Sequence, residues 1–208
     1  MISTGKFITV EGTEGVGKST NIELIKTLLQ QAGIELVVTR EPGGTPLAEE
    51  LRNVLLANRD ENFDPLAELL VVFAARAQHI NQVIKPALAA GKWVLSDRFT
   101  DATFAYQGKG RGLPIQAILQ LEQMVQQGLQ PDATFLLDID VQVGLERARE
   151  RGELDRFENE HIAFFEKVRA GYHERVAATP ERFMVINAGQ SLEAVQQDVT
   201  LAVEKLLA

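Results

Sequence analysis

The chain has 208 residues, of which 45% are hydrophobic and 24% are charged, which suits one globular domain with a buried core over residues 1–208. Its net charge of −8 argues against binding to nucleic acid or to an anionic membrane surface, so any anionic ligand needs a local cluster of cations. There is no cysteine, which excludes a disulfide framework, a thiolate zinc site and a cysteine nucleophile.

Short runs of β-branched and aromatic residues alternate with helical patterns along the chain. The runs predict strands over residues 6–11, 36–39, 93–97, 133–138 and 183–186. The helical patterns follow the first glycine-rich turn up to about residue 32 and then cover residues 46–57, 65–90, 141–151, 160–177 and 192–207. Pro86 is expected to kink or divide the helix that contains it. This alternation is typical of βαβ units, so we expect a three-layer α/β/α fold with a five-stranded parallel sheet.

The segment after the first strand carries a phosphate-binding pattern. It reads Gly12-Thr-Glu-Gly-Val-Gly-Lys-Ser19 and fits G-x-x-x-x-G-K-[ST] between a predicted strand and a predicted helix. Backbone N–H groups of such a loop hold β- and γ-phosphate oxygens, Lys18 adds a mobile positive charge, and the Ser19 hydroxyl is a ligand for Mg²⁺. The expected nucleotide-binding residues are Gly12, Thr13, Glu14, Gly15, Val16, Gly17, Lys18, Ser19 and Thr20. The alternative is a plain glycine-rich turn.

A second signal ends the strand over residues 93–97. Ligands of parallel sheets bind at the carboxyl ends of the strands, which gathers residues 12–19, 40–45 and 97–99 on one rim. An aspartate there, Asp97, can hold Mg²⁺, and the adjacent Arg98 can grip phosphate oxygens through its planar fork. A structural ion pair is the alternative. The sequence lacks the Asn-Lys-x-Asp run of a GTPase, and the chain is shorter than most motor ATPases.

With these segments the chain resembles the bacterial thymidylate kinases. The resemblance is carried by residues 10–20, the run Arg-Glu-Pro-Gly-Gly-Thr within 39–45, and residues 73–76, 96–99, 105–108 and 147–157. The segments follow in the family's order over nearly the whole length. The resemblance implies transfer of the ATP γ-phosphoryl group to dTMP, with Mg²⁺ as cofactor, and a homodimer that buries part of the helix over 65–90. Because the acceptor phosphate is already anionic near neutral pH, no protein base is expected.

The resemblance also assigns acceptor residues. Arg52 and Arg98 match arginines that grip the acceptor phosphate, and Arg76 matches the residue that reads the thymine carbonyl edge. Arg76 interrupts an apolar stretch, where an unpaired cation is costly, so a ligand or an acidic partner is expected there. The family's stacking phenylalanine is Val72 in this chain, which leaves Val72 or Phe73 beside the base. The other expected contacts are Arg40 and Pro42, Glu14 toward the sugar 3′-hydroxyl, and Thr103, Tyr106 and Gln107 around the base and sugar.

Four arginines gather near Gly152, at positions 147, 149, 151 and 156. A solvated charged helix end, with Glu146, Glu150 and Glu153 as partners, is one interpretation. The other is an arginine lid over about 147–158 that covers ATP and neutralises the transferring phosphoryl group. Other thymidylate kinases carry an arginine in the phosphate loop, which this chain lacks, so the expected catalytic residues are Lys18, Arg98, Arg147, Arg151 and Arg156. The resemblance places adenine near Ala188 and Gln190.

Other functions stay open at this point. The nearest alternative is a kinase for another nucleotide or for a deoxynucleoside, and the next is a regulatory nucleotide switch that acts on a partner. The expected partners are ATP and dTMP, without nucleic acid or membrane. The most apolar stretch, residues 69–75, is too short to cross a bilayer, and no signal-peptide pattern is found, so we expect a cytoplasmic protein.

Overall fold

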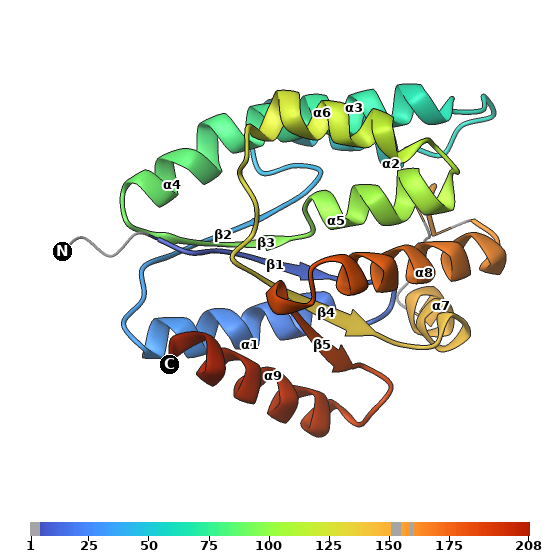
Figure 1. Cartoon of the computed structure of the whole chain (residues 1–208). Coiled ribbons are helices and arrows are strands. Elements are labelled where there is room, and N and C mark those ends of the chain that lie inside the picture. The colour runs from blue at the N-terminus through green and yellow to red at the C-terminus, as the bar shows by residue number, and fades with distance from the viewer. Residues whose placement is uncertain (1–4, 151–154, 159) are drawn as a thin grey trace.

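A parallel five-stranded sheet forms the centre of the molecule (Figure 1). The computed structural model describes residues 5–150, 155–158 and 160–208. The strands are β1 (Phe7–Glu11), β2 (Leu36–Arg40), β3 (Trp93–Asp97), β4 (Ala133–Asp138) and β5 (Phe183–Asn187), and they lie in the order β2-β3-β1-β4-β5. The expected five-stranded parallel sheet is therefore confirmed, with strand bounds that differ from the predicted ones by one residue at most.

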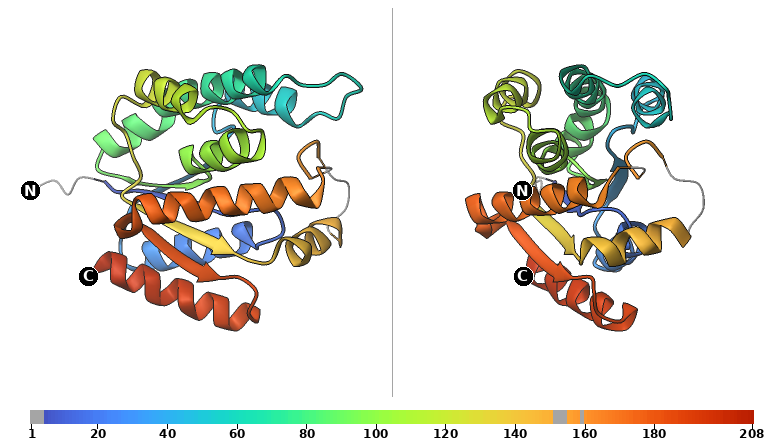
Figure 2. Two further views of the ribbon diagram at one scale, coloured as in Figure 1. Left: turned by 45° about the vertical axis from the view of Figure 1, so that its right-hand side comes forward. Right: turned by 90° about the vertical axis from the view of Figure 1, so that its right-hand side faces the viewer.

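Helices cover both faces of this sheet, which makes three layers (Figures 1 and 2). One face carries α1 (Lys18–Gln31) and α9 (Leu192–Leu207). The other carries α3 (Pro65–His79), α4 (Lys85–Ala89), α5 (Thr100–Thr103), α6 (Ile115–Gln126) and α8 (Ile162–Ala178). Helix α2 (Pro46–Leu56) packs along α3, and α7 (Val141–Glu150) packs against α8 beyond the end of β4. A short 3₁₀ turn, Pro180–Arg182, precedes β5.

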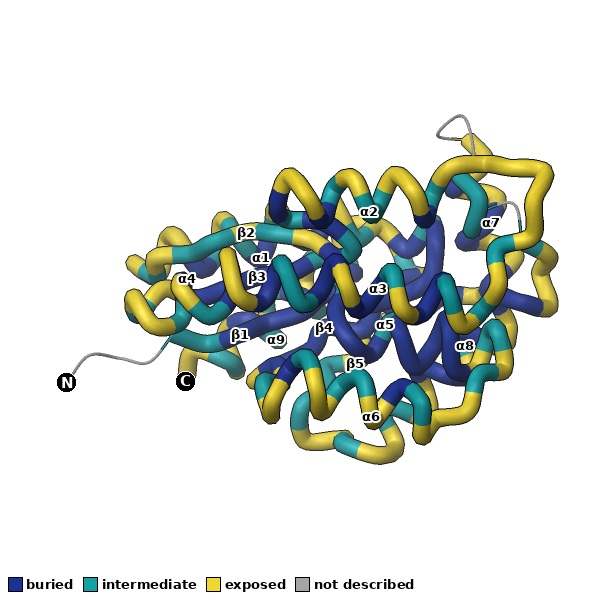
Figure 3. Tube along the Cα trace, turned by 90° about the horizontal axis from the view of Figure 1, so that it is seen from above, coloured by how far each residue is buried: buried dark blue, intermediate teal, exposed yellow. Residues whose placement is uncertain are grey.

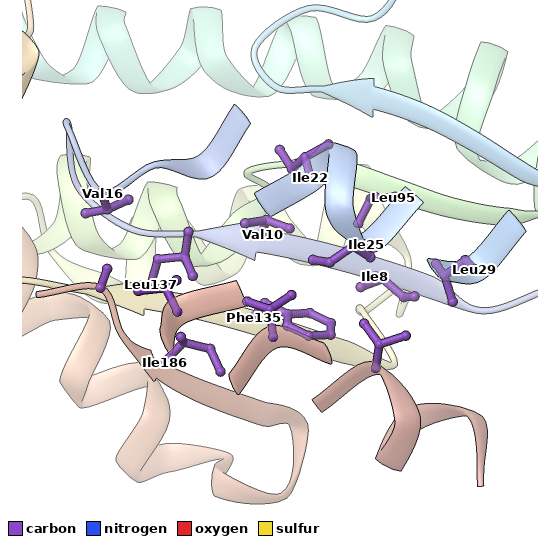
Figure 4. Close-up of a cluster of buried hydrophobic side chains, with 14 of the residues drawn as sticks. Ile8, Val10, Val16, Ile22, Ile25, Leu29, Leu95, Phe135, Leu137 and Ile186 are labelled. Carbon is purple, nitrogen blue, oxygen red and sulfur yellow. The ribbon is translucent and has the colours of Figure 1, made fainter. Parts of the chain in front are cut away.

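The main core lies between the sheet and the pair α1 and α9. Alternate residues of β1 point to opposite faces, so Ile8 and Val10 face this core while Phe7 packs on the other side. Helix α1 contributes residues at helical spacing, and Phe135 of β4 fills the centre (Figure 4). All five residues of β1 are buried, which is expected for a central strand covered on both faces.

Two segments of the helical layer contain π-helical turns. The helix predicted over 65–90 is divided by a π-helical turn, Ile80–Ile84, and α4 begins just before Pro86. The expected division of the helix is therefore confirmed, and the irregular turn lies on the N-terminal side of Pro86. Proline has no N–H to donate, which interrupts the regular helical hydrogen bonds there. The predicted elements leave residues 98–132 unassigned, whereas the structure places α5, a π-helical turn (Phe104–Gly110) and α6 there.

The strand register brings the chemically interesting residues to one edge of the sheet. Val10 pairs with Asp97, and Arg40 pairs with the same aspartate from the other side. The loops that follow β1, β2 and β3 therefore meet at the carboxyl edge, as the sequence predicts. In the described part of the chain, no helix is both long and apolar enough to pass through a bilayer.

Candidate active site

Residues 12–20 comprise the glycine-rich loop after β1 and the first residues of α1. Gly15 and Gly17 have left-handed backbone angles, φ 70° and 86°, which glycine adopts at no steric cost. A Cβ on Gly15 would lie 1.8 Å from the carbonyl oxygen of Gly144 in α7, so only glycine fits at that contact. Lys18 Nζ donates to the carbonyl oxygens of Gly12 at 3.2 Å and Thr13 at 2.9 Å. Burial and the nearby Arg98 lower the pKa of Lys18 to about 8, so its charge lacks full compensation from protein groups.

A wide hollow opens in front of this loop, and we call it the Lys18 pocket. Its lining includes Glu14, Gly15, Val16, Gly17, Lys18, Ser19, Thr20, Arg40, Glu41, Arg52, Asp97, Arg98, Arg147, Ala148, Asp155 and Glu158. The Oδ1 atom of Asp97 is buried and has no hydrogen-bond partner among the described residues. An unpaired carboxylate oxygen that shares a pocket with the Ser19 hydroxyl matches the oxygen ligands that Mg²⁺ prefers. The residues present therefore fit a magnesium ion.

Arg98 stands between the loop and a second pocket. Its backbone lies in the left-handed region, φ 68°, an uncommon and costly conformation for a residue with a side chain. Its Nη2 donates to Glu14 Oε1 at 2.9 Å, to the Tyr106 hydroxyl at 2.7 Å and to the Gly12 carbonyl at 3.2 Å. Its Nε is buried without a partner in the described residues. One edge of the guanidinium is thus anchored, while Nε remains for an anionic ligand.

Glu14 lies buried beside this arginine. The Tyr106 hydroxyl bridges both of its carboxylate oxygens, at 2.8 and 2.7 Å. Burial alone would raise the pKa of Glu14, but Arg98 and Lys18 outweigh burial and hold this pKa below its usual value. Glu14 is therefore ionised at neutral pH, and its negative charge is matched by the cations around it.

Arg76 marks the second pocket, which we call the Arg76 pocket. The residue is 2% exposed, and its Nε donates to Glu41 Oε2 at 2.7 Å. Its Nη2 donates to Thr103 Oγ1 at 2.9 Å and to the Phe99 carbonyl at 3.2 Å. Nη1 is buried with no partner among the described residues. Arg76 therefore has the expected acidic partner, Glu41, and the role of its Nη1 toward a ligand stays a prediction.

The walls of the Arg76 pocket come from several elements. They are formed by Glu14, Glu41, Pro42, Arg52, Leu55, Leu56, Val72, Arg76, Arg98, Phe99, Ala102, Thr103, Tyr106, Gln107, Asp155 and Phe157. Val72 thus lies in the wall, whereas Phe73 is buried in a cluster with Leu69, Phe104 and Ile118, with the Arg76 guanidinium 4.8 Å from its ring centroid. Of the two candidates beside a base, Val72 is the one that reaches the pocket.

Two further arginines converge where the pockets meet. Arg52 lines both pockets and donates from Nη1 to the Pro42 carbonyl at 2.9 Å. Burial, together with the charges of Arg40 and Arg98, lowers the pKa of Arg52. Arg40 lines the Lys18 pocket and pairs with Glu49 at 2.7 Å. This is the local cluster of cations that a chain of net charge −8 needs for an anionic ligand.

Comparison with known proteins agrees with this geometry. The family model described as thymidylate kinase matches residues 10–199. A thymidylate kinase of Teredinibacter turnerae is 63% identical over 98% of this chain and 100% of its own length, and one of Pseudomonas putida is 58% identical over 94% and 93%. A crystal structure of thymidylate kinase from Ehrlichia chaffeensis superposes with a TM-score of 0.78 at 35% identity, over 98% of this chain and 99% of the other. The chain belongs to the thymidylate kinase family.

The arginines expected in the lid of this thymidylate kinase are placed in different ways. Arg147 lines the Lys18 pocket and donates from Nη1 to the Ala188 carbonyl at 3.1 Å, so it lies beside the expected adenine turn. Gln190 is bonded to Asp198 and to the Asn187 carbonyl. Arg156 lines neither pocket, because its side chain is bonded to Glu68 and to the Leu55 carbonyl. Arg151 lies outside the described residues.

Two buried carboxylates in or near the pockets were absent from the expected set. Glu41 holds Arg76, and it also accepts from His79 Nδ1 at 2.9 Å. Glu11 ends β1 and accepts from the Phe99 backbone N at 2.7 Å and from the Tyr172 hydroxyl at 2.9 Å. Burial and the charge of Asp101 raise the pKa of Glu11 to about 8. Glu41 could have been found in the sequence, because it lies in residues 40–45, a segment of the predicted rim.

Proposed function

We propose that this thymidylate kinase transfers the γ-phosphoryl group of ATP to dTMP, forming dTDP and ADP, with Mg²⁺ as cofactor. One observation carries the assignment of sites: the Lys18 pocket and the Arg76 pocket adjoin and share Arg98 and Arg52 as lining residues. Two anionic ligands placed in these pockets would meet end to end at the shared arginines. This is the arrangement that phosphoryl transfer requires, because the reaction depends on alignment and charge neutralisation.

On the donor side, the phosphates of ATP would lie on the backbone N–H groups of residues 12–20. Lys18 is suited to this role, because a bound triphosphate supplies the negative charge that its buried ammonium lacks. Ser19 and Asp97 would hold Mg²⁺, which when bound neutralises charge on the β- and γ-phosphate oxygens. Ala188 and Gln190 would lie near the adenine ring.

On the acceptor side, dTMP would occupy the Arg76 pocket. The free Nε of Arg98 and the guanidinium of Arg52 would bind its phosphate, with Arg40 and Pro42 at the same end. The free Nη1 of Arg76 would donate to a thymine carbonyl, and Val72 would make an apolar contact with the ring. Thr103, Tyr106 and Gln107 complete the wall, and Glu14 would accept from the 3′-hydroxyl of the sugar.

Catalysis in this proposal needs no protein base, because the acceptor phosphate oxygen is already ionised near neutral pH. The protein's contribution is to hold the two phosphate chains in line and to spread positive charge around the transferring group. Lys18 and Arg98 supply that charge from within the described site. Because the phosphate loop carries no arginine, we assign the remaining charge to Arg147 and Arg151.

The test is an acceptor screen. Purified protein with ATP and Mg²⁺ is offered dTMP, dUMP, dCMP, dGMP, dAMP and thymidine in turn, and ADP release is measured together with the product diphosphate. We expect dTMP to give the highest kcat/KM. A higher value for another acceptor would assign a different substrate. Slow ATP hydrolysis without any phosphorylated acceptor would favour a regulatory switch instead.

We also propose that the protein works as a homodimer. Helices α3 and α6 pack against each other, and both contain exposed stretches (Figure 3). The apolar residues of these stretches include Leu66, Leu70, Ile115 and Leu119, which are 44–50% exposed. A second copy of the same surface would remove them from water, which is the usual use of such a patch. Light scattering of the intact protein and of Leu70→Glu should give a dimer and a monomer, respectively.

The location and the excluded partners follow from the substrates. Since ATP and deoxynucleotides are cytoplasmic metabolites, the proposal places the protein in the cytoplasm. Neither nucleic acid nor a membrane takes part in the reaction.

A further inference from the structure

Glu68 of α3 is a fully buried carboxylate for which the proposed reaction has no use. Gln107 Nε2 donates to its Oε1 at 2.8 Å, and Arg156 Nη2 donates to its Oε2 at 2.7 Å. Arg111 lies 3.3 Å from each oxygen through Nε and Nη2. A carboxylate without solvent contact is stable only where donors and cations replace its hydration. Here these groups come from parts of the chain that are far apart in sequence.

Arg156 connects Glu68 to residues 155–158. Its Nε donates to the Leu55 carbonyl at 2.7 Å, and its backbone N donates to the Leu56 carbonyl at 3.2 Å. The guanidinium lies 4.3 Å from the centroid of the Phe157 ring. Arg156 is therefore bound on three sides by α2, α3 and its own neighbour, so it fastens this segment to the helical layer.

The residues beside Arg156 do reach the pockets. Asp155 lines both pockets, Phe157 lines the Arg76 pocket, and Glu158 lines the Lys18 pocket. Phe157 also packs edge-on against Tyr106, with the ring centroids 5.9 Å apart. Residues 155–158 thus form part of the wall between the two proposed nucleotides, and their position depends on what holds Arg156.

Glu68 also contacts a second part of the Arg76 pocket wall. Gln107, which it binds directly, is a lining residue. Arg111 Nη1 also donates to Glu160 Oε1 at 2.5 Å, and the Arg111 guanidinium lies 4.6 Å from the centroid of the Phe164 ring. One carboxylate therefore links the π-helical turn, the segment before α8 and α3, all of which surround the same pocket.

We propose that Glu68 is a positioning residue for phosphoryl transfer, which holds residues 155–158 in the shared wall through its bond to Arg156. On this assignment Arg156 is also a positioning residue and does not neutralise the transferring phosphoryl group. The inference rests on the proposed function and adds to it the group that holds the two pockets in their relative positions.

The test is a double-mutant cycle with Glu68→Gln, Arg156→Met and the double variant, measured as kcat and as KM for each nucleotide. Each single change should raise KM for dTMP and lower kcat/KM for dTMP about ten- to a hundredfold, because small displacements of a site wall are costly. The double variant should fall within about threefold of the worse single variant, since both changes remove the same bond. If Glu68→Gln keeps normal kinetics while Arg156→Met loses kcat, Arg156 acts on phosphate and the proposal is overturned.

Asp101 provides a matched control. It is a second buried carboxylate, shared between Arg175 at 2.8 Å and Arg182 at 2.7 Å, and it lines neither pocket. Asp101→Asn should lower Tm to a similar degree as Glu68→Gln but leave KM for dTMP within about twofold of the intact protein, because the cost of unpaired arginines is common to both. An equal rise of KM in both variants would reduce Glu68 to a purely structural role and overturn the proposal.

If Glu68→Gln does not fold, Arg156→Lys still decides the question. Lysine keeps the charge near Glu68 but lacks the fork that bridges Glu68 and the Leu55 carbonyl. A raised KM for dTMP supports the proposal, and unchanged kinetics contradict it. The intact protein's activity on dTMP is measured in parallel, so a failure of the proposed function is recognised separately.

Discussion

The two pockets are built by different means. The Lys18 pocket takes its proposed phosphate-binding groups mainly from one continuous loop, residues 12–20, whose conformation is set by glycines and by the start of α1. The Arg76 pocket is assembled from side chains of α2, α3, α5, the π-helical turn and residues 155–158. The first can therefore be recognised in a sequence window, whereas the second exists only after the helices have packed. The two should also respond differently to mutation.

The largest effect is expected on the loop. Lys18→Ala should lower kcat about a hundred- to a thousandfold, because on the proposed mechanism it removes a positive charge beside the transferring group. The fold should persist, and Tm should stay equal or rise, since a buried ammonium group is costly to the folded protein. Steady-state kinetics and thermal unfolding check both statements. Near-normal turnover would remove Lys18 from the catalytic set.

Arg98→Ala tests the boundary between the pockets. Because Arg98 lines both pockets, its loss should lower kcat about a hundredfold and should also raise KM for dTMP and for ATP together. Lys18→Ala should leave KM for dTMP nearly unchanged. A change confined to one nucleotide in Arg98→Ala would show that the boundary has been assigned wrongly.

Arg76→Met probes the assembled pocket. Its KM for dTMP should rise about tenfold or more at nearly constant kcat, because in the proposed complex the arginine would bind the base away from the reacting atoms. It should also lose about 3 kcal/mol of stability, since Glu41 is left buried without its cation. Adding Glu41→Gln should recover most of the stability but not the affinity for dTMP. Recovery of both would make Arg76 a structural residue only.

Acid should loosen the same pocket through Glu41. Burial alone would raise its pKa, but Arg76 and His79 outweigh burial and lower the pKa of Glu41 below 4.5. A carboxylate with a lowered pKa in the folded state contributes stability above its unfolded pKa and loses that contribution as the pH falls through the folded value. Tm of the intact protein should therefore fall more steeply below pH 4.5 than Tm of Glu41→Gln. Parallel curves in calorimetry would contradict this.

The smallest effect is expected at Val72, the residue proposed to lie beside the base. Val72→Ala should raise KM for dTMP only a few-fold, because one lost apolar contact is worth about 1 kcal/mol. Phe73→Leu should lower Tm instead and leave KM unchanged, since Phe73 packs in the core behind Arg76. The opposite pattern would show that Phe73 and not Val72 reaches the base.

The sequence predicts the contiguous parts of this molecule well. The phosphate loop, the Asp97–Arg98 pair and all five strands follow from glycine spacing, residue type and alternation. Residues 98–132 are harder to interpret, because the π-helical turn at Phe104–Gly110 shifts the apolar face and breaks the 3.6-residue period. The direction of a side chain is also not written in the sequence. Arg147 and Arg156 belong to one cluster of arginines, yet only Arg147 faces a pocket.

Buried carboxylates are the other gap. Glutamate is usually exposed, so nothing in the sequence alone marks Glu11 or Glu68 as buried, and only its place on the predicted rim draws attention to Glu41. Their roles appear only when the arginines and tyrosines that bind them are in place. Each stands beside a residue that the sequence does point out, namely Arg98, Arg76 and Arg156, so a predicted functional arginine is a reason to search for its carboxylate.

The close approach of Gly15 to Gly144 limits the substitutions that the chain can accept at these two positions. A Cβ on Gly144 would itself lie 2.6 Å from the Glu14 carbonyl oxygen, so each glycine is required by the backbone of the other segment. No single substitution at either position can be accommodated without moving the phosphate loop or helix α7. In a saturation library selected for kinase activity, these two positions should tolerate fewer replacements than the proposed nucleotide-binding residues.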